Sequence, residues 1–420
     1  MLFCLELKRG ISMNVDILVI GGGISGLTAA VEAAETGYSV ALVEKNPYLG
    51  GRVTQLTKYF PKMCPPYCGL EIFLKRLKNC ENLQVITNAK VKKVEGVAGN
   101  FNVFVEVRPR FVNENCTACG ECEKVCPVER PNDFDFGMDK TKAIYLPHDM
   151  AFPPIYVIDP DVCNKCGECV KVCKYDAINL DEQPQELTIN AKVIIVATGW
   201  NPYDATKLET LGFGKYPNVI TNMMMERLAS PSGPTKGKIV RPSDGKEPKI
   251  VAFAQCAGSR DENHLPYCSA VCCLATMKHA LYVREQIPDS KVYIFYIDRR
   301  AYGRYEDFFQ KVDQDENIVF IRGKVAKVEE GENGNVIVHA EDTETGKKVQ
   351  MEVELLVLAT GMQPTTAVEK IEGLEYDDYG FVVEKEGIIP CGVARMPADV
   401  ASSNRDATGA VIRAIQVVRG

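Results

Sequence analysis

The feature that most constrains this chain is a run of four cysteines that occurs twice with identical spacing. The first run is Cys116, Cys119, Cys122 and Cys126, and the second is Cys163, Cys166, Cys169 and Cys173. A [4Fe–4S] cluster needs soft thiolates from one tight loop and a further thiolate from elsewhere, which this spacing provides. Zinc sites and a disulfide framework are the alternatives, but two tandem runs, the first followed by Pro127, favour iron–sulfur clusters.

The two runs together are typical of a two-cluster ferredoxin. In such proteins the fourth cysteine of each run binds the cluster of the other run. We therefore expect two crosswise ligand sets. One set is Cys116, Cys119, Cys122 and Cys173, and the other is Cys126, Cys163, Cys166 and Cys169.

Composition limits the number of domains, the cellular compartment and the classes of partner that are expected. The 420 residues, 46% hydrophobic and 25% charged, predict about two to three domains with sizeable cores. The 17 cysteines are an odd number, which argues against complete disulfide pairing and predicts a reducing cytoplasm. A net charge of −7 without a long basic run argues against nucleic acid as a partner. No apolar stretch approaches the about 20 residues of a membrane helix, so membrane association would go through partner subunits. Residues 1–12 lack the features of a signal peptide, and Met13 is the expected start.

A glycine-rich turn near the N-terminus predicts a dinucleotide site. Apolar residues 15–20 read as a buried parallel strand, and Gly21-Gly22-Gly23-Ile24-Ser25-Gly26 leads into an alanine-rich helical pattern. The glycines let the backbone approach a pyrophosphate, and the helix N-terminus offers N–H groups to its charge. Glu44 ends the next strand, where a carboxylate accepts from ribose hydroxyls and disfavours a 2′-phosphate. A purely structural glycine turn is the alternative.

Later turns favour FAD as the dinucleotide. Gly50-Gly51-Arg52 continues a pattern of flavoproteins with two dinucleotide-binding domains. The turns Ala197-Thr198-Gly199 and Ala359-Thr360-Gly361 resemble the return points in thioredoxin-reductase-like flavoproteins. Asp399 precedes the last helix, which is expected at 407–418. In that family, an aspartate at this position binds the flavin ribityl chain. The expected cofactor-binding residues are Gly21, Gly23, Ser25, Gly26, Glu44, Lys45, Gly51, Arg52, Thr198, Gly199 and Asp399.

The cysteine runs interrupt this flavin domain. A strand pattern at 101–108 stops at Pro109 and resumes at 186–189, so the ferredoxin region is an insertion. The expected fold is α/β, with two dinucleotide-binding, thioredoxin-reductase-like domains and an inserted α+β two-cluster ferredoxin domain. The expected boundaries are 13–109 and 186–230 for the flavin domain, 110–185 for the insert, 248–360 for the second nucleotide-binding-like domain and 361–420 for the return to the flavin domain.

The second nucleotide-binding-like domain has cysteines where a pyridine-nucleotide reductase has glycines. Its first strand, 249–254, runs into Gln255-Cys256-Ala257-Gly258-Ser259-Arg260, which is unsuited to a pyrophosphate, and no Cys-x-x-Cys motif occurs there. Cys256, Cys268, Cys272 and Cys273 are candidate ligands of a further cluster. Buried structural thiols and a zinc site are the alternatives.

These motifs in this order resemble the A subunit of heterodisulfide reductase. The motifs that carry the resemblance are 21–26, 50–52, the ferredoxin insert, 255–260 and Tyr267–Cys273. The resemblance implies that the four cysteines of the second domain bind an additional [4Fe–4S] cluster beside the flavin. The N-terminal iron–sulfur domain and the C-terminal ferredoxin of the full-length family member are expected to be lacking.

In this compact form, and in residues 395–409, the chain is more similar to the A subunit of the quinone-interacting membrane-bound oxidoreductase of sulfate reducers. That resemblance implies two partners in a complex, a second flavin subunit with iron–sulfur groups and a membrane haem subunit. It also implies a link from menaquinone to adenylylsulfate reductase.

Cys64 and Cys68 form a separate pair. In the larger relatives, cysteines in this neighbourhood help to hold the cluster of the N-terminal domain that is expected to be lacking here. A partner-facing cluster, a redox disulfide and two structural thiols remain open. Cys4, Cys80 and Cys391 are isolated and expected to be structural.

The parts together predict an electron-transfer flavoprotein subunit without a catalytic acid, base or nucleophile of its own. FAD exchanges two electrons with one partner and single electrons with clusters, so flavin is the expected junction and the clusters the conducting chain. The alternatives are a component of a soluble electron-bifurcating heterodisulfide reductase complex, an NAD(P)H:ferredoxin-type reductase, and an assembly scaffold with structural clusters.

Overall fold

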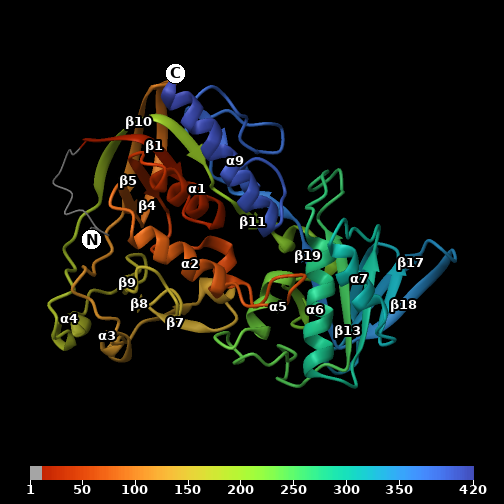
Figure 1. Ribbon diagram of the computed structural model, residues 1–420. Coiled ribbons are helices and arrows are strands. Elements are labelled where there is room, and N and C mark those ends of the chain that lie inside the picture. Colours follow the sequence, from red (N-terminus) through yellow and green to blue (C-terminus); the bar gives the residue numbers. More distant parts are fainter. Residues whose placement is uncertain (1–11) are drawn as a thin grey trace. The chain divides into compact units, whose positions relative to one another are not determined.

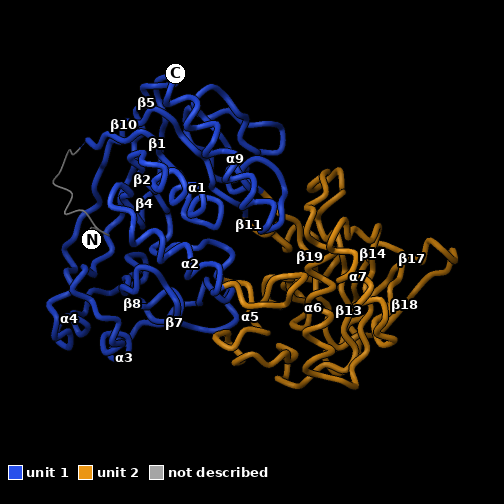
Figure 2. Tube along the Cα trace, in the orientation of Figure 1, with its two compact units in different colours: residues 1–54, 67–200, 364–420 blue, residues 55–66, 201–363 orange. Residues whose placement is uncertain are grey.

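The computed structural model describes residues 12–420, which divide into two compact units (Figures 1 and 2). Among the described residues, unit 1 comprises Ser12–Thr54, Tyr67–Trp200 and Pro364–Gly420, and unit 2 comprises Gln55–Pro66 and Asn201–Gln363. Cys4 and the expectation about residues 1–11 lie outside the described residues. Among residues 12–420, no helix combines the length and the apolar character needed to cross a membrane.

Unit 1 is built on a mixed sheet in the order β3-β2-β1-β10-β5-β4, with β21 also paired to β10. The strands are β1 (Ser12–Ile20), β2 (Val40–Val43), β3 (Leu83–Ile86), β4 (Ala89–Val97), β5 (Asn100–Val107), β10 (Gln185–Val196) and β21 (Ile388–Pro390). Strands β3, β2, β1, β10 and β21 are parallel, whereas β5 and β4 are antiparallel to their neighbours. The segment expected at 186–189 is part of one continuous strand, β10, in which residues 185–191 pair with β5 and residues 188–196 pair with β1.

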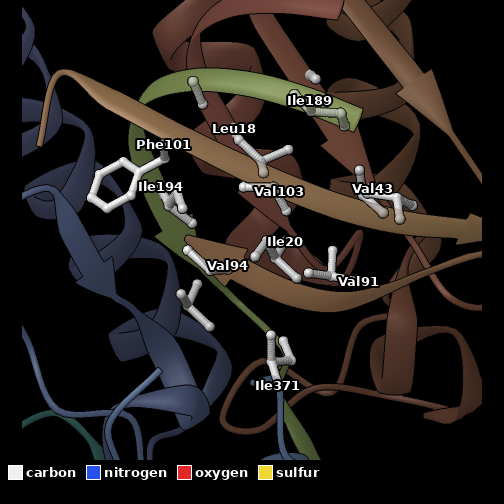
Figure 3. Packing of buried hydrophobic residues seen from close by; sticks show 14 of the residues in the cluster. Leu18, Ile20, Val43, Val91, Val94, Phe101, Val103, Ile189, Ile194 and Ile371 are labelled. Carbon is white, nitrogen blue, oxygen red and sulfur yellow. The ribbon is translucent and has the colours of Figure 1, made fainter. Parts of the chain in front are cut away.

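The core of unit 1 explains the apolar runs of its parallel strands. Leu18, Val103 and Ile194 are fully buried in one cluster that spans three neighbouring strands (Figure 3). Helices cover this sheet: α1 (Ile24–Glu35) contacts β1 and β10, and α9 (Val400–Arg419) contacts α1, β10 and β21. Strand segments buried on both faces lack an alternating pattern, as residues 17–20 of β1 show.

The other short elements of unit 1 are η1 (Gly51–Gln55), α2 (Tyr67–Lys78), α8 (Thr365–Val368) and η6 (Gly392–Ala394). The cysteine-rich insertion lies between β5 and β10. It contains α3 (Glu121–Val125), β6 (Glu129–Pro131), η2 (Asp133–Asp135), β7 (Lys140–Lys142), β8 (Ile144–Tyr145), β9 (Val157–Ile158) and α4 (Glu168–Val172). An antiparallel bridge between Val112 and Ile178 joins its entry to its exit.

Unit 2 has a parallel sheet in the order β12-β19-β13-β14-β15. These strands are β12 (Val219–Thr221), β13 (Ile250–Ala257), β14 (Lys291–Tyr296), β15 (Ile318–Arg322) and β19 (Leu355–Thr360). An antiparallel sheet adds β16 (Val325–Glu330), β17 (Val336–Asp342) and β18 (Lys347–Val353). The helical elements are η3 (Ala205–Lys207), η4 (Glu209–Leu211), α5 (Asn222–Ala229), α6 (Cys272–Gln286), α7 (Tyr305–Asp313) and η5 (Glu332–Gly334).

The chain leaves unit 1 along β11 (Trp200–Pro202) and returns along β20 (Met362–Pro364), and these two strands pair. Each follows one of the Ala-Thr-Gly turns. Residues 201–230, expected in the flavin domain, lie in unit 2 instead. The physical reason is that β12 pairs with β19 of the second sheet, a partner more than 130 residues later in the chain.

Candidate functional site

The structure gathers the eight cysteines of the insertion into two groups of four. One cavity is lined by Cys116, Cys119, Cys122 and Cys173, together with Tyr156. A second cavity is lined by Cys126, Cys163, Cys166 and Cys169. These are the crosswise sets expected from the spacing, because each short helix carries its fourth cysteine toward the other loop. All eight are free thiols.

Local backbone conformation explains how each loop presents its first three cysteines. Ala118 and Lys165 occupy the left-handed region at φ 55°, and Gly120 and Gly167 follow at φ 80° and 77°. Two residues in the left-handed conformation so close together make the loop turn around the cavity that its cysteines line. The helices α3 and α4 then begin, and each buries its own cysteine, Cys122 or Cys169.

Burial weakens the acidity of one thiol in each cavity. Burial, followed by the charge of neighbouring Cys116, raises the pKa of Cys122 to about 12. Burial likewise raises the pKa of Cys169. A thiolate there requires nearby positive charge, which iron supplies, so binding of a cluster would release protons.

The two glycine segments of unit 1 lie against each other and leave no room for side chains. Gly50 N–H donates to Gly22 O at 2.8 Å, and a bridge joins Gly23 to Gly50. A Cβ on Gly26 would lie 1.7 Å from Gly21 O, and one on Gly51 would lie 2.9 Å from Gly23 Cα. Helix α1 starts here with no side-chain cap, so its first N–H groups stay available to an anion. This backbone fits a dinucleotide pyrophosphate.

Glu44 is buried beside these glycine segments, which together form a cradle for the dinucleotide. Its carboxylate can accept a further hydrogen bond from a hydroxyl group. Its Oε2 accepts from Gly22 N at 2.6 Å, and its Oε1 accepts from Asn46 N at 2.7 Å and Asn46 Nδ2 at 2.8 Å. Burial raises the pKa of Glu44 despite these hydrogen bonds. Since each carboxylate oxygen has two lone pairs, Oε2 has one left for a ribose hydroxyl.

Residues far apart in sequence complete the cradle. The hydroxyl of Thr198 is buried, and within the described part of the chain it has no hydrogen-bond partner. A buried orphan hydroxyl beside Gly21 is what a site for a polar cofactor provides. Gly392 lies at φ 59° and a Cβ there would meet Ser25 Oγ at 2.3 Å, so the C-terminal segment approaches the first turn of α1. Gly392 was not among the expected residues, because no local pattern distinguishes it.

The remaining expected flavin residues have identifiable partners. Asp399 is buried at the N-cap of α9, where its Oδ1 accepts from Ser402 N at 2.7 Å. The last helix thus begins at Val400 and not at 407, because Asp399 caps it. Arg52 Nε donates to Trp200 O at 3.2 Å, and Lys45 pairs with Glu369 at 3.2 Å on the surface. Gly199 O accepts from Thr365 N at 3.1 Å.

Unit 2 brings together the four cysteines of its own loop. Cys256 is the penultimate residue of β13 and lies at φ 56°, where the register with β19 shifts. Cys272 and Cys273 begin α6. Burial, then the charges of Cys273 and Cys268, raise the pKa of Cys256 to about 11. Burial and then the other three thiols raise the pKa of Cys272. These electrostatic effects indicate that the four thiols lie near one another.

Unit 2 also contains a buried charged cluster that no sequence motif predicts. Glu226 on α5 pairs through Oε1 with Lys278 Nζ and His279 Nε2, both at 2.5 Å, and all three are at most 2% exposed. Burial alone would raise the pKa of Glu226, but the charge of Lys278, followed by His279, lowers it to about 2. Burial lowers the pKa of His279, and the neighbouring carboxylate of Glu226 opposes this shift.

This cluster also holds the segment that leads to Cys64. Glu226 Oε2 accepts from Thr57 N at 2.9 Å, and Lys278 Nζ donates to Lys58 O at 2.7 Å. Cys64 then pairs with Tyr59 through its backbone, and Cys64 and Cys68 are free thiols. No sequence motif joins Glu226 to Lys278, because the two helices meet only in the folded unit.

Comparison with known proteins agrees with this geometry. The model of the family described as FAD dependent oxidoreductase matches residues 16–69, and models of 4Fe-4S binding domains match residues 113–130 and 156–179. Thioredoxin reductases of Thermoplasma acidophilum and Lactococcus lactis superpose with TM-scores of 0.54 and 0.52 at 15% and 16% identity. They cover 97% and 96% of this chain, which covers 99% of each, and this likeness establishes the thioredoxin-reductase-like fold.

Sequence relatives are closer. The A subunit of the H2:CoB-CoM heterodisulfide, ferredoxin reductase of Methanothermobacter thermautotrophicus is 40% identical over 98% of this chain. The iron-sulfur A subunit of the CoB–CoM heterodisulfide reductase of Methanocaldococcus jannaschii is 42% identical over 96%. The chain spans 65% and 64% of the length of these two relatives. Over the region that it shares with them, the chain is similar to heterodisulfide reductase A subunits, and it combines a segment of the FAD dependent oxidoreductase family with [4Fe–4S] motifs.

Proposed function

We propose that this protein is an FAD- and iron–sulfur-containing electron-transfer subunit of a heterodisulfide-reductase-like complex. The observation that carries the proposal is the presence, within unit 1, of a dinucleotide cradle and two cavities that are each lined by four cysteines. When bound, FAD exchanges electron pairs with one partner and single electrons with clusters. The chain's own residues bind and orient these groups, and none of them needs to act as an acid or base.

The residues assigned to each group follow from the geometry. The glycines at 21, 23, 26 and 51 and the N-terminus of α1 would hold the pyrophosphate, Glu44 the ribose, and Thr198 and Asp399 polar groups of the flavin half. The two crosswise cysteine sets would each hold one [4Fe–4S] cluster. Cys256, Cys268, Cys272 and Cys273 would hold a third, supported by their convergence in unit 2.

The partners are redox proteins. The finer proposal is a complex with a second flavin subunit plus a membrane haem subunit, which passes electrons between a quinone pool and adenylylsulfate reductase in sulfate reduction. It is supported by the resemblance of residues 395–409 to the corresponding protein of sulfate reducers. A soluble, electron-bifurcating complex is the second candidate, since the Methanothermobacter relative is named for both heterodisulfide and ferredoxin.

The first test is the cofactor content of anaerobically purified protein. About twelve irons and one FAD per chain are expected for three clusters, at four irons each. About eight irons would remove the third cluster, and absence of flavin would overturn the proposal. Reduction of the bound flavin by NADH or NADPH alone would favour an NAD(P)H:ferredoxin-type reductase. Clusters that exchange no electrons with the flavin would favour a scaffold.

A further inference from the structure

Arg110 is a buried arginine at the entry of the cysteine-rich insertion, three residues after β5 ends. Its side chain is buried, with the residue 4% exposed. Its Nε donates to Tyr156 O at 3.1 Å and its Nη2 donates to Ile155 O at 2.7 Å. Its backbone oxygen also accepts from Ile158 N at 3.2 Å. Arg110 therefore fixes the segment 155–158 of the insertion.

The same guanidinium reaches the cofactor loop, which we define as residues 44–52. Its Nη1 donates to Pro47 O at 2.8 Å and lies 3.4 Å from Thr87 Oγ1. Pro47 lies midway between Glu44 and Gly50. One planar group thus binds backbone oxygens on both sides of the boundary between the insertion and the flavin-type sheet. The five fixed donors of arginine allow this, whereas the single ammonium of lysine cannot reach all of these acceptors.

The insertion segment held by Arg110 forms a wall of one cysteine cavity. Tyr156 lines the cavity of Cys116, Cys119, Cys122 and Cys173. Its hydroxyl donates to Glu123 Oε2 at 2.8 Å, on the helix that carries Cys122. The cavity wall is therefore connected through one residue, Arg110, to the cofactor loop.

The segment between the two cysteine runs, residues 127–160, forms a long arm that makes a second connection to the cofactor loop. Leu49 N donates to Phe152 O at 2.8 Å. The ring of Tyr48 packs edge-on against His148 at 5.0 Å between centroids, and His148 stacks on Phe134 at 4.8 Å. The arm thus packs on the cofactor loop.

We propose that Arg110 is a positioning residue for electron transfer, which holds the cavity of Cys116, Cys119, Cys122 and Cys173 at a fixed distance from the cofactor loop. The inference rests on the proposed function, in which each transfer oxidises the flavin by one electron and reduces one cluster by one electron. The rate of electron transfer falls steeply as two centres move apart. Weakening the hydrogen bonds of Arg110 therefore slows electron transfer between flavin and cluster without releasing either cofactor.

The test compares Arg110→Lys and Arg110→Met with Arg108→Lys, an exposed control two residues away. Each full-length variant is purified anaerobically, and its iron, sulfide and flavin contents are measured first. Hydrogen exchange is then followed at the amides of Leu49 and Ile158. Finally, bound flavin is reduced with a pulse of photoreduced deazaflavin, and the subsequent loss of cluster absorbance gives the transfer rate.

We expect Arg110→Lys to keep its iron and flavin, to exchange both amides faster and to transfer electrons at least about tenfold more slowly, as small displacements of reacting groups can cost. Arg108→Lys is expected to match the wild type. An Arg110→Lys protein with full cofactors and the wild-type transfer rate would overturn the inference. If Arg110→Met loses its cofactors, Arg110→Lys decides the outcome. Wild-type protein that lacks flavin or shows no transfer at all would instead contradict the proposed function.

Discussion

The two units use the same strand–loop–helix position for different chemistry. In unit 1, β1 leads through glycines into α1, and the backbone is bare enough to approach a phosphate. In unit 2, β13 leads into α6, but Cys256 lies next to the end of the strand, and Cys272 and Cys273 begin the helix. Both loops lie at the carboxyl end of a parallel strand, where α/β sheets bind ligands. The comparison teaches that the fold determines where a ligand can bind, whereas the residues of the loop determine which kind of ligand it is.

The largest expected effect comes from placing a side chain in the cradle of unit 1. Gly26→Val would drive its Cβ into Gly21 O, where a backbone atom cannot move aside. We expect complete loss of bound FAD and a free energy of unfolding lower by about 3 kcal/mol or more. Flavin absorbance and thermal unfolding measure both. The matched control is Gly69→Ala, on the open face of α2, where retention of FAD and equal or higher stability are expected.

The cysteine loop of unit 2 gives the next prediction. Cys272→Ser should lose about four irons per chain and retain about eight together with FAD, whereas Cys122→Ser should lose a cluster of the insertion. Cys80→Ser, outside all of these sets, should retain every iron. Iron and sulfide analysis with flavin quantification separates the two ligand variants from Cys80→Ser. If Cys272→Ser keeps its full iron content, the third cluster does not exist and the two loops differ only in sequence.

The buried cluster of Glu226, Lys278 and His279 occurs in unit 2 and was not among the expected sites. Substituting Glu226 tests how much this cluster stabilises the unit. Glu226→Gln would leave Lys278 buried without a carboxylate, at a cost of about 3–5 kcal/mol in stability. Glu285→Gln, on the exposed partner of Lys58, should change stability by less than about 0.5 kcal/mol. Chemical denaturation at neutral pH tests both. Equal stability of the two variants would contradict a role for the buried pair.

The pH dependence of this cluster has a definite sign. The pKa of Glu226 falls from 4.5 to about 2 on folding, so the unfolded chain binds the proton more readily. The stabilisation is therefore complete above pH 4.5 and is lost as the pH falls toward about 2. Wild-type stability should decline over this window, and Glu226→Gln should flatten that part of the decline. A decline as steep in the variant as in the wild type would assign it to other groups.

The smallest expected effect concerns Thr198. Since its hydroxyl is buried without a partner in the described chain, Thr198→Val should leave the stability of the flavin-free protein unchanged or slightly raised. Affinity for FAD should fall by about 1 kcal/mol, or roughly fivefold, if the hydroxyl binds the cofactor. Flavin titration of the flavin-free variant measures the change. An unaltered affinity would place the hydroxyl outside the site.

Much of the site was predictable because its ligands are local in sequence. Cys116, Cys119 and Cys122 share one loop, and only Cys173 had to come from elsewhere, so a spacing rule sufficed. The same holds for Gly21 to Gly26, where strand, turn and helix follow directly. By contrast, the boundary expected at residue 230 was displaced to Trp200, because β12 pairs with a strand that the local pattern of residues 201–230 could not indicate.

By itself the sequence determined the cluster loops, the dinucleotide turn and the order of the segments, since neighbouring residues encode each of these. Only the tertiary structure decided which residues meet across distance. It brought Glu226 to Lys278, Gly392 to Ser25, and Arg110 to both Tyr156 and Pro47. These contacts depend on how helices and strands pack, and buried polar groups find their partners only when the chain has closed around them.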